Sequence, residues 1–325
     1  MKKYIILILA TAAVFIGSVQ LLMNQQQEEI TITSRFTFVC PLKWELMAEG
    51  MKAADQEFLT NTKFVGFQNL DAQEQAKALQ KAVYAKVSGI ITAGSNYSPL
   101  VIEAVNDAVK AGIPVVLVDS DLPASDRTCY IGTDNKAAGR MAGEDLVEAT
   151  GHNAKIGILV SRLDNENQKE RVEGFREAIA PYPEMQVLEV LECESDRMRV
   201  QKLAEQMLRQ YPDMDAIYCA EEVSTQMIGG ILNGSGSSGK DYCVVGHGLN
   251  EKIWSYIKEG RYYSTIVEED YDRGYQAVNY LWNYINGYDT DVDVIHTQID
   301  SIKKDFDFEA WDHAHEEEEV VWDLS

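Results

Sequence analysis

The chain has 325 residues, of which 46% are hydrophobic, so it can bury the cores of two domains and is too apolar to be disordered throughout. Asp and Glu number 52 against 29 Lys and Arg, which gives a formal net charge of −23. Nucleic acid and anionic membrane surfaces repel such a chain, so we do not expect it to bind nucleic acid.

The N-terminus begins Met1-Lys2-Lys3, and residues 4–23 then form an uncharged, mainly apolar run. The apolar region of a secretion signal usually spans ~7–15 residues and a membrane-spanning helix ~20, so the length favours a retained signal-anchor over a cleaved signal peptide. No small-residue cleavage motif follows the run, and no cysteine near Leu22 marks a lipoprotein. In either case residues 1–29, spacer included, direct the remaining chain out of the cytoplasm.

The first half of the exported chain alternates short apolar runs with amphipathic stretches, which predicts strands alternating with helices. Strands are expected at residues 35–40, 64–67, 89–93, 115–118 and 130–131, and helices at 45–58, 72–86, 99–111 and 137–149. This spacing is typical of β-α-β units around a parallel sheet.

The same alternation starts again in the second half. Strands are expected at residues 155–160, 185–191, 216–219, 242–245 and 263–267, and helices at 168–180, 197–209, 225–232, 251–259 and 271–285. The sequence therefore predicts an α/β protein with two doubly wound parallel sheets, one in each half.

Polar side chains gather where two neighbouring strands of the first half end. Asp119 directly follows the apolar run 115–118, and Thr133-Asp134-Asn135 follows the next strand. Ligands of open α/β sheets bind beyond such carboxyl ends, which makes these side chains candidate ligand contacts. Two other roles are open: Asp119 could form a turn before Pro123, and Thr133 or Asn135 could cap the following helix.

Six segments carry a resemblance to a known family. They are K-V-S-G-I-I (86–91), G-I-P-V-V-L-V-D (112–119), I-G-T-D-N-K-A-A-G (131–139), R-V-E-G-F (171–175), V-V-G-H-G (244–248) and G-Y-Q-A-V (274–278). In order and spacing they resemble the type I periplasmic solute-binding proteins, the ribose-binding-protein family of sugar ABC transporters.

The resemblance implies two lobes joined by a hinge of three crossing strands, near Thr133, Glu268 and Gln298. The N-terminal lobe would comprise residues 35–133 and 269–298, and the C-terminal lobe residues 134–268 and 299–305. Residues 306–325 have no counterpart that we can place. They form an acidic tail, because Glu316 to Glu319 are consecutive.

The resemblance also implies ligand contacts, each with an ordinary structural alternative. Trp44 lies where the family stacks an aromatic on the sugar, although a core aromatic at a helix start is the alternative. Asp119 matches the ligand-binding aspartate, and Thr133 and Asn135 match polar contacts near the hinge. Lys169 lies where ribose binders carry an arginine against the sugar, and its alternative is a solvated helix face.

The chain departs from the family at several of these positions. Glu221 replaces an asparagine, with Glu222 beside it, and Glu268 replaces the glutamine of ribose binders. Gly248 stands where a second aspartate is usual, and Ser195 replaces a frequent aromatic. Carboxylates in a closed cleft must be paired or hydrogen-bonded, so we expect a ligand rich in donors, with an amine as one option.

The expected function is therefore binding of a sugar or sugar-like molecule for delivery to an ABC permease, with a sensor histidine kinase as the alternative partner. A LacI-type repressor shares the fold but would need an N-terminal DNA-binding helix pair where the apolar run stands. An enzyme would need a nucleophile–base pair or a metal set, and we identify none and expect no cofactor or metal. The five scattered cysteines are expected to be buried small apolar residues, although a disulfide stays open.

Overall fold

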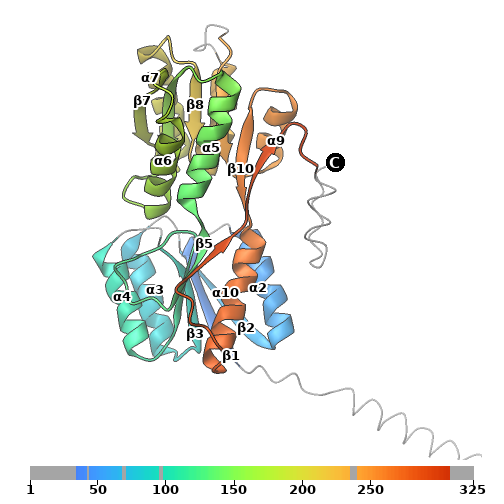
Figure 1. The fold of residues 1–325 in the computed structure, drawn as a ribbon. Helices are drawn as coiled ribbons and strands as arrows, with labels where there is room; N and C mark the ends of the chain where they lie inside the picture. Colours follow the sequence, from blue (N-terminus) through green and yellow to red (C-terminus); the bar gives the residue numbers. More distant parts are fainter. Residues whose placement is uncertain (1–33, 42–43, 68–70, 95–97, 235–239, 308–325) are drawn as a thin grey trace, which may run out of the picture.

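The computed structural model describes residues 34–41, 44–67, 71–94, 98–234 and 240–307. These residues form two lobes, each an α/β sandwich around one sheet (Figure 1). The predicted fold class is confirmed. The apolar run and almost all of the acidic tail lie outside the described residues. Within those residues, no helix has the length and apolar character to cross a membrane.

The first lobe contains a six-stranded sheet in the order β11-β5-β4-β3-β1-β2, with every pair parallel. Its strands are β1 (Ser34–Pro41), β2 (Thr60–Phe67), β3 (Gly89–Ala93), β4 (Val115–Val118), β5 (Cys129–Thr133) and β11 (Val294–Thr297). Helices α2 (Glu45–Phe58) and α10 (Asp270–Ile285) share one core with the sheet, and α3 (Ala72–Tyr84) and α4 (Pro99–Lys110) share another. Alternate strand residues face the two cores, as the pleat requires.

The second lobe has the order β12-β10-β9-β8-β6-β7, and only β12 is antiparallel to its neighbour. Its strands are β6 (Ala154–Val160), β7 (Met185–Glu192), β8 (Ala216–Cys219), β9 (Cys243–His247), β10 (Ser264–Glu268) and β12 (Ile299–Lys303). One face carries α5 (Asn135–Thr150) and α6 (Glu166–Ile179), and the other carries α7 (Arg197–Gln210), α8 (Glu222–Leu232) and α9 (Glu251–Lys258).

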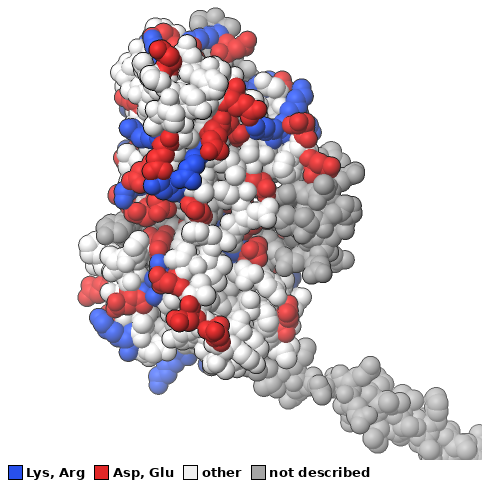
Figure 2. All heavy atoms as spheres, viewed as in Figure 1, with Lys and Arg blue, Asp and Glu red and all other residues white. Residues whose placement is uncertain are grey.

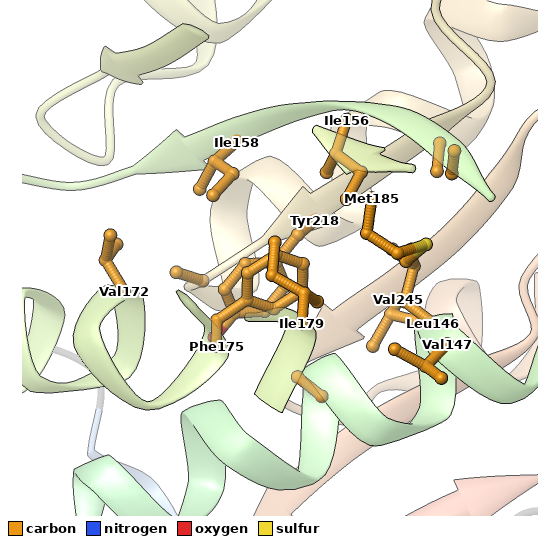
Figure 3. Close-up of a cluster of buried hydrophobic side chains, with 14 of the residues drawn as sticks. Leu146, Val147, Ile156, Ile158, Val172, Phe175, Ile179, Met185, Tyr218 and Val245 are labelled. Carbon is orange, nitrogen blue, oxygen red and sulfur yellow. The ribbon is translucent and has the colours of Figure 1, made fainter. Parts of the chain in front are cut away.

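The core between α5, α6 and the second sheet is dry and aromatic at its centre (Figure 3). Phe175 stacks on Tyr218 with ring centroids 4.5 Å apart and planes inclined by 6°. This stacking fixes α6 against β8, which places the N-terminal half of α6 beside the carboxyl end of the sheet. Acidic side chains are spread over the surfaces of both lobes (Figure 2).

The chain passes between the two sheets three times. It leaves the first sheet after Thr133, returns to it after Glu268, and crosses again between β11 and β12. The first two crossings start at the carboxyl ends of β5 and β10, where the two lobes meet (Figure 1). The end at which parallel sheets of this type bind ligands is therefore turned toward the opposite lobe in both halves.

Most elements lie within a few residues of their expected bounds, and α2, β3, β4 and β8 match them. The structure differs from expectation at β2, which begins at Thr60 rather than at residue 64, because Thr60 and Thr62 both bond to Asp55 of α2. Strands β11 and β12 were not expected from the residues. The five cysteines, all among the described residues, form no disulfide, and four of them are buried.

Candidate functional site

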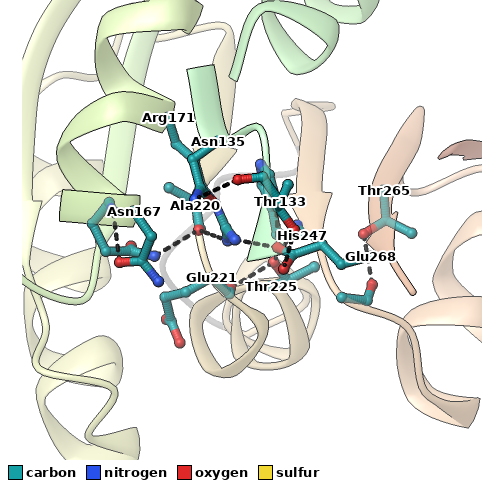
Figure 4. Close-up of polar contacts among 12 residues, drawn as sticks. Thr133, Asn135, Asn167, Arg171, Ala220, Glu221, Thr225, His247, Thr265 and Glu268 are labelled. Carbon is teal, nitrogen blue, oxygen red and sulfur yellow. Dashed lines mark hydrogen bonds and ion pairs between the residues drawn. The ribbon is translucent and has the colours of Figure 1, made fainter. Parts of the chain in front are cut away.

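A carboxylate bound by two arginines lies at the junction of the lobes. Glu268 ends β10, and its Oε1 is paired with the guanidinium of Arg171 from α6. Its Oε2 lies 2.8 Å from Nη2 of Arg273, which belongs to α10 of the first lobe. Thr133, at the end of β5, donates its hydroxyl to the same Oε2 at 2.9 Å. Figure 4 shows Arg171, Thr133 and Glu268 converging from three different elements.

Both arginines are nearly inaccessible to solvent and are held by further bonds. Arg171 donates from Nε to Asn135 Oδ1 at 2.9 Å and from Nη1 to the Ala220 carbonyl at 2.9 Å. Arg273 donates to Asp270 at 2.9 Å and to the Thr133 hydroxyl at 3.0 Å. Because each guanidinium donates to several fixed acceptors, neither arginine side chain can rotate without breaking hydrogen bonds.

Close helix contacts at glycines bring the two arginines to this position. A Cβ on Gly174 would lie 1.9 Å from the Lys136 carbonyl oxygen of α5, so α6 and α5 can approach only because that Cβ is absent. A Cβ on Gly274 would lie 2.0 Å from the Met47 carbonyl oxygen of α2. Arg273 therefore directly precedes, and Arg171 lies one turn before, the glycine that lets its helix pack closely against its neighbour.

The charges of the cluster are matched. Burial alone would raise the pKa of Glu268, but Arg171, His247 and Arg273 together hold it well below its usual range. For Arg273, burial favours the neutral form, yet Asp270, Glu268 and Asp119 raise its pKa further. Glu268 and Arg273 are consequently charged in the folded protein.

Asp119 lies beside this cluster, at the end of β4. Its Oδ1 is 3.8 Å from Nη1 of Arg273, and its side chain is 25% exposed. Burial raises the pKa of Asp119 to about 6, and the attraction of Arg273 only partly opposes that shift. The residue adopts φ 64°, in the left-handed region that Asp tolerates better than most residues. Tyr130 donates its hydroxyl to the Asp119 carbonyl at 2.8 Å and thereby supports this conformation.

His247, at the end of β9, links Glu268 to the core of the second lobe. Its Nε2 lies 2.8 Å from the Tyr218 hydroxyl, and its Nδ1 lies 3.9 Å from Glu268 Oε1. Burial lowers the pKa of His247 to about 4, with Arg171 acting in the same direction. The imidazole is therefore neutral near pH 7. It lies between Glu268 and the Phe175–Tyr218 stack and adds no charge there.

The three polar residues that follow β5, Thr133, Asp134 and Asn135, have different structural roles. Asp134, rather than Thr133 or Asn135, caps α5, because its carboxylate accepts from the Ala137 amide at 2.8 Å. Thr133 and Asn135 are both buried and face the cluster through Glu268 and Arg171. The capping alternative is thus excluded for these two residues, and their expected place near the ligand site stays a prediction.

Glu221 is buried, and donors of the chain itself surround its carboxylate. It accepts from the Ser224 amide at 2.6 Å, the Val223 amide at 2.9 Å and the Ser195 hydroxyl at 3.2 Å. It therefore caps α8. The expectation that Glu221 and Glu268 require donors from a ligand is not supported, because amides, a hydroxyl and two arginines already supply them.

The remaining candidate residues lie farther from the centre of the cluster. Trp44 immediately precedes α2 and is half-buried, with its ring 5.9 Å from that of Phe38. Lys169 is exposed and pairs with Glu166 of its own helix at 3.1 Å. Glu222 is exposed and accepts from Asn250 at 2.6 Å. The structure does not join these three side chains to Glu268, and their contact with a ligand stays a prediction.

Gly248 has a local reason to lack a side chain. Its φ is 81°, and a Cβ there would lie 2.7 Å from Cγ of Glu222. An aspartate at this position would be strained and would collide with Glu222, so the two departures from the family pattern belong together.

Three residues of the cluster were not predicted as site residues. Arg171 and His247 were noted only as parts of the family-like segments 171–175 and 244–248, and Arg273 was not singled out. A signal was present, since each arginine lies close to a glycine inside a predicted helix. A glycine there costs helix stability and usually indicates close packing. Among the residues that the structure describes, no group of His, Cys, Asp and Glu could hold a metal ion.

Residues 43–289 match the family described as periplasmic binding protein domain. The chain belongs to this family. It is 29% identical over 203 residues to the ribose import binding protein RbsB of Salmonella typhimurium strain LT2, a match that covers 61% of this chain and 67% of that protein.

Two solved structures extend the match over both lobes. The structure of GanP, a glucose-galactose binding protein from Geobacillus stearothermophilus, is 28% identical, covers 83% of this chain and 98% of that chain, and gives a TM-score of 0.78. The XylFII chain of a XylFII-LytSN complex is 26% identical, covers 84% of this chain and 99% of that chain, and gives a TM-score of 0.76. The family is one of binding proteins.

Proposed function

We propose that the protein is an extracytoplasmic solute-binding protein that closes on a sugar or sugar-like molecule and delivers it to an ABC transporter. The observation that carries this proposal is the arrangement of the two sheets. Their carboxyl ends face each other across a charged cluster to which both lobes contribute. The printed names of the relatives, a ribose import protein and a glucose-galactose binder, support the substrate class.

The moving parts would be two lobes, residues 35–133 with 269–298 and residues 134–268 with 299–305. Ligand contacts would come from both lobes. The proposed residues are Trp44, Asp119, Thr133, Asn135, Lys169, Glu221, Glu222 and Glu268, to which the geometry adds Arg171 and Arg273. None is assigned a catalytic role, in keeping with a family of binding proteins.

The bonding of the carboxylates favours a neutral polyhydroxy ligand over an amine. Glu221 and Glu268 are satisfied by the chain, whereas Asp119 keeps a partly exposed carboxylate that can accept two hydroxyl hydrogen bonds. The Ser120 hydroxyl and Asn165 Oδ1 are buried without a hydrogen-bond partner among the described residues. A ligand with several hydroxyl groups can serve acceptors and donors of this kind.

A ligand screen followed by calorimetry tests the proposal. Pentoses, hexoses, polyols and amino sugars are added in a thermal-shift assay, in which a ligand at 100 times its Kd stabilises by about 2.7 kcal/mol. Asp119→Ala should then weaken binding of the selected ligand by about 2–5 kcal/mol, since it removes an acceptor that closure on the ligand would bury. Glu103→Ala, an exposed acid on α4, is the control. Equal affinity of Asp119→Ala and wild type would refute the site.

Attachment to the membrane is part of the proposal. We infer that residues 4–23 are retained as an anchor, because the apolar run has the length of a membrane span. Mass spectrometry of the membrane-extracted protein measures the mature N-terminus. A terminus between Ser18 and Glu29 would leave secretion and overturn the anchor.

A sensor histidine kinase is the second candidate partner, and one similarity favours it. The XylFII chain, 26% identical to this one, was solved in a complex with LytSN. In-cell crosslinking of the anchored protein, with mass spectrometry of the captured membrane proteins, separates the two readings. A permease supports delivery, and a kinase sensor domain supports signalling.

A further inference from the structure

The edge of the first sheet that faces away from the second lobe carries exposed apolar side chains. All strands of this sheet are parallel, so their amino ends share that edge, which we call the basal edge. Six exposed apolar or aromatic residues lie on segments that lead into its strands: Leu59, Tyr84, Tyr284, Ile285, Tyr288 and Val292. We call these the basal patch. Tyr84 is 85% exposed and Tyr288 58%.

The α10 side of the basal patch rests on a row of stacked rings. Phe58 at the end of α2 stacks on Trp282 at 4.9 Å, and Trp282 stacks on Tyr288 at 5.4 Å. Tyr284 lies on Tyr280 at 6.4 Å. The exposed tyrosines are therefore held outward by rigid neighbours. Tyr and Trp, with an apolar body and a polar tip, are enriched where proteins meet the water–lipid interface.

The same edge carries basic residues, although the chain as a whole is strongly acidic. Arg35 is the second residue of β1, Lys81 and Lys86 lie at the end of α3 and just beyond it, and Lys110 ends α4, all with exposed side chains. Basic side chains project from the lower end of the first lobe (Figure 2). Asp289 and Asp291 lie on the β11 side of the edge, and the exposed Asp107 and Asp126 lie on the α4 side, so the positive charge is greatest around Lys81 and Lys86 at the end of α3.

The position of the chain's own apolar segment identifies the partner of this surface. The described structure begins at Ser34, on the basal edge, and residues 4–23 form the apolar run. Residues 24–33 connect the two, and an extended chain spans at most ~3.3–3.6 Å per residue. If the run lies in a membrane, these residues hold the basal edge within about 35 Å of its surface.

We propose that the basal patch and the neighbouring basic residues rest on the outer face of the membrane, with the tyrosines among the lipid headgroups and the lysines near anionic lipid phosphates. The first lobe is then fixed to the membrane, and the second lobe remains free to open and close. This inference rests on the retained anchor proposed above. Each basic residue near an anionic surface contributes about fivefold to the population in contact.

Two spin-labelled variants of the full chain in lipid nanodiscs test the contact. Tyr84→Cys places a label on the basal patch, and Met198→Cys places one on α7 of the second lobe, where Met198 is 78% exposed. The parent chain treated with the same spin label gives the background, which should be low because four of its five cysteines are buried. The Tyr84 label should collide severalfold more with oxygen, relative to a water-soluble nickel chelate, than the Met198 label.

A charge change tests the lysines. Lys81→Gln, Lys86→Gln and Lys110→Gln together should lower the lipid contact of the Tyr84 label at least tenfold in nanodiscs of anionic lipid. The matched control removes three exposed lysines of the second lobe, with Lys202→Gln, Lys252→Gln and Lys258→Gln, and should leave it unchanged.

The outcomes separate the inference from the anchor. A chain that does not remain with lipid in flotation overturns the anchor and this contact together. A chain that floats while both labels stay equally open to the nickel chelate overturns the contact alone. In the third outcome, the Tyr84 label is accessible to the nickel chelate in nanodiscs and becomes protected only when a kinase sensor domain or a second copy is added. This result would assign the basal patch to a protein partner and would overturn the membrane contact.

Discussion

Glu268→Gln tests how much the buried charged cluster contributes to the free energy of unfolding. The substitution preserves the shape of the side chain but removes the charge that neutralises Arg171 and Arg273. Its amide nitrogen would also face a guanidinium donor in either of its two orientations, Arg171 in one and Arg273 in the other. Removing one partner of a buried ion pair costs about 3–5 kcal/mol. Asp270 remains 2.9 Å from Arg273, so the penalty falls mainly on Arg171, and we expect a loss of about 3 kcal/mol.

Urea unfolding at pH 7, followed by far-UV circular dichroism, measures this loss. Glu166→Gln is the matched control, because it removes the same charge from the exposed pair with Lys169, which should contribute about 0–1 kcal/mol. Adding Arg171→Met to Glu268→Gln should recover part of the loss, since it removes the uncompensated buried charge. Equal losses for Glu268→Gln and Glu166→Gln, or no recovery in the double variant, would refute the reasoning.

Three further predictions concern the groups around the cluster. Burial raises the pKa of Asp119 from 3.8 to about 6. Between these two pH values the folded protein binds a proton that the unfolded chain has lost. The contribution of Asp119 to the free energy of unfolding therefore falls as the pH rises through this range. Relative to wild type, Asp119→Asn should therefore gain about 2 kcal/mol of unfolding free energy from pH 4 to pH 6 in urea titrations, and a constant difference would contradict the shift. His247→Phe should cost about 1–3 kcal/mol by leaving the buried Tyr218 hydroxyl unpaired, and a second change, Tyr218→Phe, should then cost less than it does in wild type. Gly174→Ala should lower the thermal midpoint and weaken ligand binding, because the added Cβ would meet a carbonyl of α5. Gly230→Ala is the control: its Cβ meets only ordinary contacts, so it should be neutral or stabilising by up to about 1 kcal/mol. Similar shifts for both variants would count against close packing at Gly174.

The hydrophobic pattern predicted the elements well because each buried run matches the period of its element. The run 115–118 is buried throughout, as a strand covered on both faces requires. The pattern failed where burial is incomplete. Residues 60–63 are polar, and their place in β2 depends on bonds to Asp55. Strands β11 and β12 are short and half-exposed, so they carry little periodic signal.

The candidate site was predicted in part. Asp119, Thr133 and Asn135 follow strands whose carboxyl ends could be located from the sequence, and the structure joins all three to one cluster, Asp119 and Thr133 through Arg273 and Asn135 through Arg171. The partners of Glu268 could not be found in this way, because Arg171 lies 97 positions away and Thr133 lies 135 positions away. A charged residue in a helix usually indicates a solvated face, and only the nearby glycines distinguish the two buried arginines.

The charge of a cleft is decided by the sum over both lobes, not by the carboxylates at the strand ends. Counting Glu221 and Glu268 alone predicts a site that prefers cations. The structure brings two arginines from helices against Glu268 and Asp270, which balances those four charges. Asp119 is then the carboxylate of this cluster whose charge is least matched, and it is also the one with an exposed fraction of 25%. A partly exposed carboxylate whose ion pair with Arg273 is long, at 3.8 Å, beside fixed guanidinium donors, suits the hydroxyl groups of a neutral ligand, because each hydroxyl can donate to the carboxylate and accept from a guanidinium.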